Sequence, residues 1–162
     1  MTLPTTPGSI VRFLVPQEDG EPDMWYVATL IPGHIEDDGT AHALVWASAY
    51  VDDPEDAGNV FSEEFITSHP VEVVVETVPA TEENAQFVEA TKDSGFATIG
   101  LVLRVWSDLD DIWETFTYAP GFQAFSGELE DCMFTNSYGG FISHSDIESR
   151  EHQFLFVPTA FV

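Results

Sequence analysis

Basic residues are nearly missing from this chain. Its 162 residues include only 4 Lys and Arg against 29 Asp and Glu, which gives a formal net charge of −25 at pH 7. Four cations cannot neutralise a row of phosphates, so we expect neither direct binding to nucleic acid nor binding to an anionic membrane. The acids occur along the whole chain, so the entire folded surface is expected to be negative.

Cysteine and long apolar runs are also scarce. The single cysteine, Cys132, leaves no partner for an intramolecular disulfide and fits a reducing compartment. No apolar run approaches the roughly 20 residues that span a bilayer. The first segment, MTLPTTPGSIVRFLVPQEDG, has neither the basic region nor the apolar core of a signal peptide. We therefore expect a soluble, cytoplasmic protein.

Apolar residues are present in the amount that a folded core requires. Hydrophobic residues make up 44% of the chain, and the aromatic residues include 13 Phe and 4 Trp. This excludes a disordered acidic tail, which would lack aromatic residues. The length predicts one domain over residues 1–162, and no internal repeat is evident.

Most of the predicted elements are strands. Stretches rich in β-branched and aromatic residues are separated by turn signals such as EDGEPD at 18–23. These stretches predict strands over residues 9–15, 25–31, 41–51, 71–78, 96–106 and 153–157. In VEVVVETV the alternation places Glu72 and Glu76 on one face and three valines on the other, which favours an antiparallel sheet with one wet face.

Helix signals are fewer. Thr81 is a suitable N-cap for a helix over residues 82–93, which Gly95 would end. A second helix is predicted where Leu109, Ile112, Trp113 and Phe116 follow the spacing i, i+3, i+4 and i+7, with Ser107 as its N-cap.

Two further segments are short. Ser62 precedes one helical turn, and Ser145 with Glu148 has the spacing of a capping box. The predicted fold class is therefore α+β, a single domain of mainly antiparallel β-sheet with two or three short helices.

No residue pattern points to catalysis. With 29 acids, close pairs of carboxylates arise by chance on any surface, and no nucleophile elbow, GxGxxG loop or phosphate-binding P-loop is present. Cys132 lies in ELEDCMF, where neighbouring carboxylates raise rather than lower the pKa of a thiol. We therefore expect a non-enzymatic protein without a cofactor.

Metal-ligand patterns are equally weak. DDPEDAG at 52–58 and DLDDIWE at 108–114 do not match a calcium-binding loop. His144, Asp146 and His152 could converge on a transition metal, but their spacing fits no zinc motif, and a polar loop with a short helix explains them better. We expect no metal.

The excess of acid has three competing explanations, because such a surface repels itself unless salt or a partner offsets it. Salt adaptation would favour Asp over Glu and would retain arginine. In this chain Glu outnumbers Asp and only three Arg remain, so both observations argue against salt adaptation. A structural or assembly role, such as that of a virion component, suits a β-rich chain without catalytic motifs. The third explanation is a binding protein that imitates nucleic acid or caps a basic nucleic-acid-binding site.

We favour the third explanation. Because duplex DNA carries one charge per about 1.7 Å, 25 charges correspond to roughly 40 Å of duplex. DNA mimics among phage and plasmid anti-defence proteins, and immunity proteins against nuclease toxins, work in this way, and the likeness is one of composition. We expect an inhibitor of a basic, nucleic-acid-binding protein. The expected contact residues form two strongly charged clusters: Asp52, Asp53, Glu55, Asp56, Asp108, Asp110 and Asp111.

Overall fold

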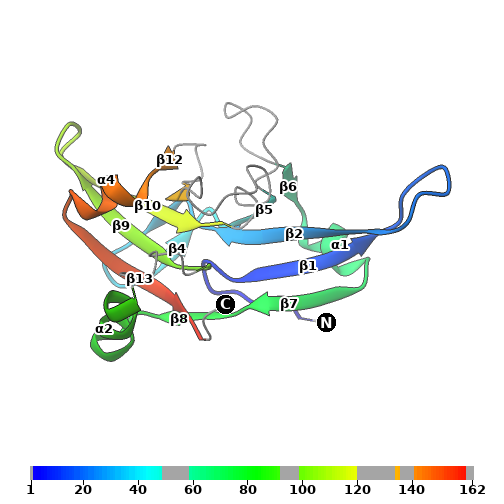
Figure 1. Cartoon of the computed structure of the whole chain (residues 1–162), viewed down its shortest axis with the longest axis horizontal. Helices are drawn as coiled ribbons and strands as arrows, with labels where there is room; N and C mark the ends of the chain where they lie inside the picture. The colour runs from blue at the N-terminus through cyan, green and yellow to red at the C-terminus, as the bar shows by residue number, and fades with distance from the viewer. Residues whose placement is uncertain (1, 49–58, 92–98, 120–133, 136–140, 160–162) are drawn as a thin grey trace.

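The computed structural model describes residues 2–48, 59–91, 99–119, 134–135 and 141–159 (Figure 1). Their strands form two antiparallel sheets and a small separate hairpin. Within these residues the structure has short helices only, so the predicted α+β class is confirmed.

The first sheet has five strands in the order β6-β5-β2-β1-β7. Its strands are β1 (Ile10–Val15), β2 (Met24–Ile31), β5 (Val45–Ser48), β6 (Asn59–Phe61) and β7 (Val71–Val75). Helix α1 (Glu63–Thr67) joins β6 to β7, and the Ser62 hydroxyl accepts a hydrogen bond from the Phe65 amide at 3.1 Å, as its capping role predicts.

The second sheet has six strands in the order β12-β11-β10-β9-β13-β8. Its strands are β8 (Thr77–Pro79), β9 (Val102–Ser107), β10 (Ile112–Tyr118), β11 (Phe134–Thr135), β12 (Phe141–Ile142) and β13 (His152–Pro158). Helices α2 (Glu82–Thr91) and α4 (His144–Glu148) contribute Val88 and Ile147 to the apolar cluster on one face. The hairpin β3 (His34–Ile35) and β4 (Ala41–His42) places Ile35 against the other face.

Two predicted strands are each divided in the structure. The segment predicted over 41–51 contains β4 and β5, and its last residues lie outside the described part of the chain. The segment predicted over 71–78 is divided at Glu76, so that β7 belongs to the first sheet and β8 to the second. A bulge in the pairing with β1 makes Val73 and Val75 pair with the consecutive residues Val11 and Ile10, which face opposite sides of the sheet. The predicted alternation therefore does not extend to Val75.

The helix predicted around Leu109 is wrong, because this segment is the second half of a β-hairpin. β10 pairs with β9 from Ile112 opposite Ser107 to Thr117 opposite Val102, and Leu109 lies 93% exposed in the turn. The β-branched and aromatic residues of β10 suit a strand. The pairing with β9 selects the alternating pattern of a strand over the helical spacing of the same apolar residues. Ser107, the predicted N-cap, closes the hairpin turn: its hydroxyl accepts the Asp110 amide at 3.3 Å and its carbonyl accepts the Asp111 amide at 2.8 Å.

The helix predicted over 82–93 is confirmed over residues 82–91 as α2, and its last two residues lie outside the described part of the chain. Its N-cap is Thr81, whose hydroxyl accepts the Asn84 amide at 3.2 Å, while the Asn84 side chain accepts the Thr81 amide at 2.6 Å. Gly95, its expected end, lies outside the described residues. The last short helix begins earlier than expected, because Ser143 rather than Ser145 is its N-cap.

The expectation of no internal repeat is also wrong. The strands β6-β5-β2-β1-β7 of the first sheet have counterparts, in the same order, in β12-β11-β10-β9-β13 of the second. Arg12 lies opposite Glu72 and Arg104 opposite Gln153, and the strand after the short helix carries a bulge in both sheets. The chain therefore contains two copies of one β-rich unit, here called the first and second halves.

A close contact between two equivalent glycines relates the halves. Gly8 precedes β1 and donates its amide to the Leu30 carbonyl, while Gly100 precedes β9 and donates to the Tyr118 carbonyl. Each glycine approaches the carbonyl oxygen of the other, which is the reciprocal contact expected around a two-fold axis. Both have positive φ, +87° and +92°, which a residue without a Cβ adopts at low cost.

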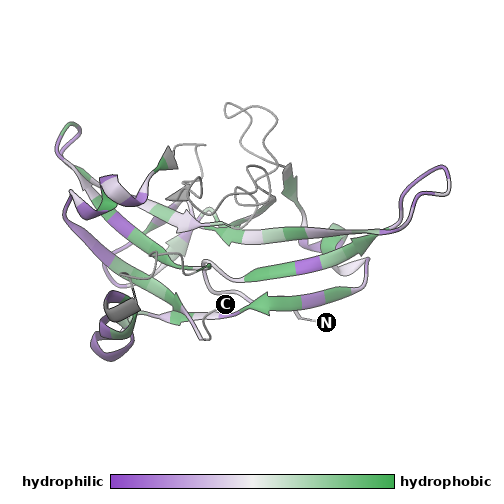
Figure 2. Ribbon diagram, viewed as in Figure 1, coloured by the Kyte–Doolittle hydropathy of each residue, from purple (hydrophilic) through white to green (hydrophobic). Residues whose placement is uncertain are grey.

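Each half has its own apolar cluster. In the first half Phe13, Ala28 and Trp46 on the sheet pack with Ile66 of α1. Figure 2 shows apolar residues along the middle of the strands and hydrophilic ones in the β1–β2 connection and on α2. The hairpin connections therefore remain free to project into solvent.

Candidate functional site

The structure places one of the two expected contact clusters. Asp108, Asp110 and Asp111 form the exposed β9–β10 turn, at one end of the long axis of the molecule (Figure 1). The other cluster, Asp52, Asp53, Glu55 and Asp56, lies outside the described residues. The expectation of a projecting position therefore holds for the β9–β10 cluster, although it sits on a hairpin rather than at the start of a helix.

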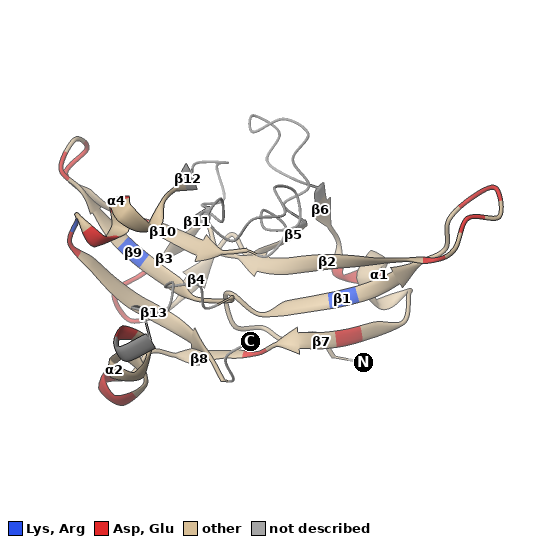
Figure 3. Ribbon diagram, viewed as in Figure 1, with Lys and Arg blue, Asp and Glu red and all other residues tan. Residues whose placement is uncertain are grey.

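A second acidic connection occupies the equivalent position in the first half. The β1–β2 connection carries four exposed acids: Glu18, Asp19, Glu21 and Asp23. Figures 1 and 3 show it at the opposite end of the long axis from the β9–β10 turn. Residues 18–23 are here called the first acidic tip and residues 108–111 the second. Sequence reasoning read 18–23 as a turn and missed the equivalence, which only the repeated strand order reveals.

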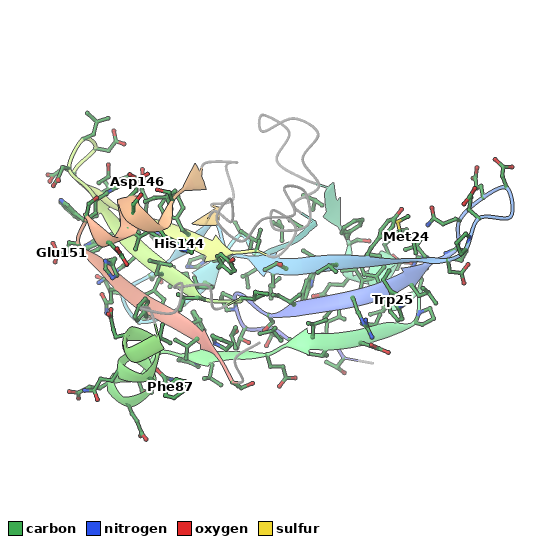
Figure 4. All side chains as sticks on the ribbon, in the orientation of Figure 1. Met24, Trp25, Phe87, His144, Asp146 and Glu151 are labelled. Atoms are coloured by element: carbon green, nitrogen blue, oxygen red, sulfur yellow. The ribbon has the colours of Figure 1, made fainter. Side chains whose placement is uncertain are left out.

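An exposed apolar residue stands at the base of each tip. Met24 begins β2 and is 53% exposed, and Ile112, its counterpart at the start of β10, is 52% exposed. Figure 4 shows Met24 and Trp25 beside the first tip. Each tip therefore combines several carboxylates with exposed apolar side chains, which include Trp25 beside the first tip and Leu109 within the second.

The described arginines pair with carboxylates outside the tips. Arg12 pairs with Glu72, its Nε donating to Oε2 at 2.7 Å, and Arg104 pairs with Asp37 at 2.9 Å. Arg150 lies 4.0 Å from Glu114 and donates its Nε to the Trp106 carbonyl. Figure 3 shows the blue positions of β1 and β9 within the sheets and red at both tips. In the described part of the chain, the arginines are thus paired with carboxylates that lie outside the two tips.

Two of these arginines repeat one structural arrangement. The Arg12 guanidinium lies 4.5 Å from the ring centre of Trp25, and that of Arg104 lies 4.6 Å from the ring centre of Trp113. Each also donates its Nε to the residue opposite it on the neighbouring strand, Glu72 or Gln153. Cation–π and hydrogen-bond contacts of this kind hold the arginines on the sheets.

The large acid excess predicts that salt stabilises the fold. Like-charge repulsion at a net charge of −25 opposes the compact state, and salt screens it over about 8–10 Å at 0.10–0.15 M. The melting temperature should rise by several degrees between low salt and about 0.5 M NaCl. Calorimetry in NaCl and in choline chloride of equal ionic strength separates screening from specific ion binding. A melting temperature that does not change with salt would contradict this prediction.

The histidines that sequence reasoning weighed as metal ligands have separate surroundings. His152 lies on β13, where its Nδ1 is 3.0 Å from the Arg150 carbonyl and its Nε2 is 3.8 Å from Glu89. His144 and Asp146 lie on α4 (Figure 4), and burial lowers the pKa of His144 while Glu148 acts in the opposite direction. Among the described residues, no group of three or more side chains is placed to hold a metal ion.

The helices of the described residues are too short or too polar to cross a membrane.

Comparison with known proteins adds no further assignment. No protein-family model matches the chain, and neither a similar characterised protein nor a similar solved structure is found. Function must therefore be argued from the charge and geometry of this chain itself.

Proposed function

We propose that this protein is a non-enzymatic inhibitor that occupies the nucleic-acid-binding surface of a basic protein. The observation that carries the proposal is the placement of two acidic tips at equivalent positions, at opposite ends of the molecule, with Arg12 and Arg104 paired with carboxylates on the sheets between them. A basic groove that binds duplex DNA is adapted to anionic charge that is distributed along the groove.

The repeated architecture supports this proposal. Many DNA-binding proteins are two-fold dimers that contact two half-sites, and the halves of this chain are related by an approximate two-fold axis. The two tips can therefore meet two equivalent basic surfaces. Met24 and Ile112 add an apolar contact at each end, where burial slows dissociation while the carboxylates speed association.

The proposal is tested by competition with DNA. The full-length protein is immobilised, basic proteins from a lysate are captured at low salt, and a captured protein is then tested with duplex DNA in a gel-shift assay. DNA and this protein should exclude one another, and capture should fall steeply as salt rises. If the partner binds DNA and this protein together, or capture is unchanged at about 0.5 M salt, an assembly interface replaces the proposed inhibition.

Neutralised variants locate the contact. Asp108→Asn/Asp110→Asn/Asp111→Asn changes the second tip, and asparagine is tolerated at Asp111, where φ is +56°. Association with the captured partner should slow by roughly ten-fold or more, because steering depends on local charge. Glu82→Gln/Glu83→Gln on α2 is the control outside the tips. Equal slowing in the control would show that net charge, rather than the tip, determines binding.

The acidic cluster that lies outside the described residues is also part of the proposal. Asp52, Asp53, Glu55 and Asp56 are neutralised in a separate variant, and we expect the same slowing of association. An unchanged association rate would limit the contact to the two tips.

A further inference from the structure

A groove runs between the β3–β4 hairpin of the first half and the outer face of the second sheet. Its volume is about 510 Å³, and the residues that determine its chemistry are Glu36, Asp37, Arg104, Trp106, Asp111 and Trp113. Asp111 belongs to the second acidic tip, so the groove opens next to it. The β3–β4 turn is held by the Thr40 amide, which donates to the Asp38 carboxylate at 2.9 Å and lowers the pKa of Asp38.

Two indole rings line the sheet side of this groove. Trp106 and Trp113 lie opposite one another on β9 and β10, with ring centres 5.3 Å apart and planes at 71°. They form two apolar walls at a steep angle. Tryptophan faces of this kind attract guanidinium and ammonium groups, most strongly where water is partly excluded.

The groove already holds one guanidinium, that of the chain's own Arg104. It lies 4.6 Å from the ring centre of Trp113, donates to the Asp37 carboxylate at 2.9 Å and donates to Gln153 at 2.9 Å. This arrangement shows directly that an indole face and a carboxylate of the groove hold a guanidinium together.

Negative charge remains after Arg104 is counted. Three carboxylates, those of Glu36, Asp37 and Asp111, line the groove against one guanidinium. Asp37 is 95% exposed and its contact with Arg104 uses Oδ1, which leaves Oδ2 for a second donor. The groove therefore has the charge and the second indole, Trp106, that a further cation requires.

We infer that this groove binds an arginine side chain of the protein partner, an inference that rests on the proposed function. The incoming guanidinium packs on Trp106 and pairs with Asp37 and Asp111. Arginine is favoured over lysine, because its planar group both stacks on an indole and donates two hydrogen bonds to one carboxylate.

The first half provides an internal control. There the equivalent arginine, Arg12, stacks on Trp25 and pairs with Glu72, so one guanidinium faces one carboxylate. The position equivalent to Trp106 is Leu14, so the second indole wall is replaced by an aliphatic side chain. The same fold therefore presents a neutral surface there, and we expect no binding of arginine.

The experiment uses the full-length protein and two probes, N-acetyl-arginine amide and the peptide acetyl-Gly-Arg-Gly-amide, with N-acetyl-lysine amide for comparison. Indole N–H signals of ¹⁵N-labelled protein are assigned with Trp→Phe variants. The signals of Trp106 and Trp113 should shift saturably with both arginine probes, with a Kd on the order of millimolar, while that of Trp25 stays in place. Lysine amide should bind more weakly.

Substitutions test which groups bind the probe. Asp111→Asn should weaken binding roughly three-fold, and Asp37→Asn/Asp111→Asn should weaken it roughly five-fold or more. Glu72→Gln in the first half should leave it unchanged, and melting curves establish that each variant is folded. Absence of saturable shifts at Trp106 and Trp113, equal shifts at Trp25, or unchanged affinity in Asp111→Asn would overturn the inference.

The result separates this inference from the proposed function, because the probes need no partner. If the probes bind but DNA does not compete with this protein for the captured partner, the groove is an arginine site and the proposed inhibition is wrong. If DNA competes but the probes do not bind, the inhibition stands and the groove plays no part in it.

Discussion

Replacing Gly8 with alanine is expected to destabilise the protein by about 2–6 kcal/mol, the sum of backbone strain and a steric clash. The φ of Gly8 is +87°, a conformation that alanine adopts only with strain. A Cβ at this position would also overlap the Gly100 carbonyl oxygen and lie 2.8 Å from a methyl carbon of Val102. Because Gly8 and Gly100 meet where the two halves approach, the clash would separate them. Urea denaturation monitored by circular dichroism measures the loss.

Gly20 provides the matched control for this substitution. Its φ is +76°, close to that of Gly8, but no atom lies within 4 Å of the position that a Cβ would take. Gly20→Ala should therefore cost only the backbone strain, on the order of 1 kcal/mol. Equal destabilisation by the two substitutions would show that the contact between Gly8 and Gly100 does not hold the halves together.

Replacing Phe13 with alanine should cost about 3–5 kcal/mol, the range for a large aromatic side chain removed from a core. Phe13 is fully buried, and its ring contacts those of Tyr26, Phe61 and Phe65 edge to face at 5.2–5.9 Å. The cavity left behind removes these contacts as well as the buried apolar surface. The loss should appear as a lower midpoint of the urea transition with an unchanged slope.

The same substitution tests whether the halves unfold together. β7 and β8 belong to different sheets but are separated by Glu76 alone, and the Thr159 amide donates to the Glu76 carbonyl at 2.9 Å. We therefore expect one cooperative transition, shifted both by Phe13→Ala and by Val105→Ala at the equivalent position of the second half. Two separable transitions, each shifted by one substitution, would show two independent domains and would contradict the prediction of a single domain over residues 1–162.

Elements with one consistent local pattern could be predicted from the sequence. β1 and β2 have a high content of β-branched and aromatic residues, and α1 and α2 begin at residues whose side chains cap the first turn. These are local interactions, so they leave a local signal.

β10 could not be assigned in this way, because the spacing of its apolar residues is compatible with both a helix and a strand. Leu109, Ile112 and Phe116 match a helical stripe, yet Phe116 lies opposite Leu103 on β9. The choice depends on a pairing partner, and periodicity carries no information about that partner.

The repeat was hidden for a related reason. FSEEFITS before β7 and ISHSDIES before β13 share only Ser, Ile and Ser at matching positions. Strand order and register depend on size and polarity rather than identity, so two different sequences can adopt one topology. The first acidic tip was missed because only the repeated strand order makes it equivalent to the second tip. Asp37 and Trp106 were missed because only the packing of the β3–β4 hairpin on the second sheet brings them to one groove.

The sequence by itself determined the sign of the surface, since 29 acids cannot be neutralised by 4 bases in any fold, and it determined the preference for β-structure. Where the charge gathers was decided by tertiary structure. The antiparallel pairing of β1 with β2 and of β9 with β10 turns two acidic segments into tips at opposite ends of the molecule. Charge is a sum over residues, whereas its arrangement depends on contacts between segments far apart in the chain, and such contacts form only when the sheets assemble.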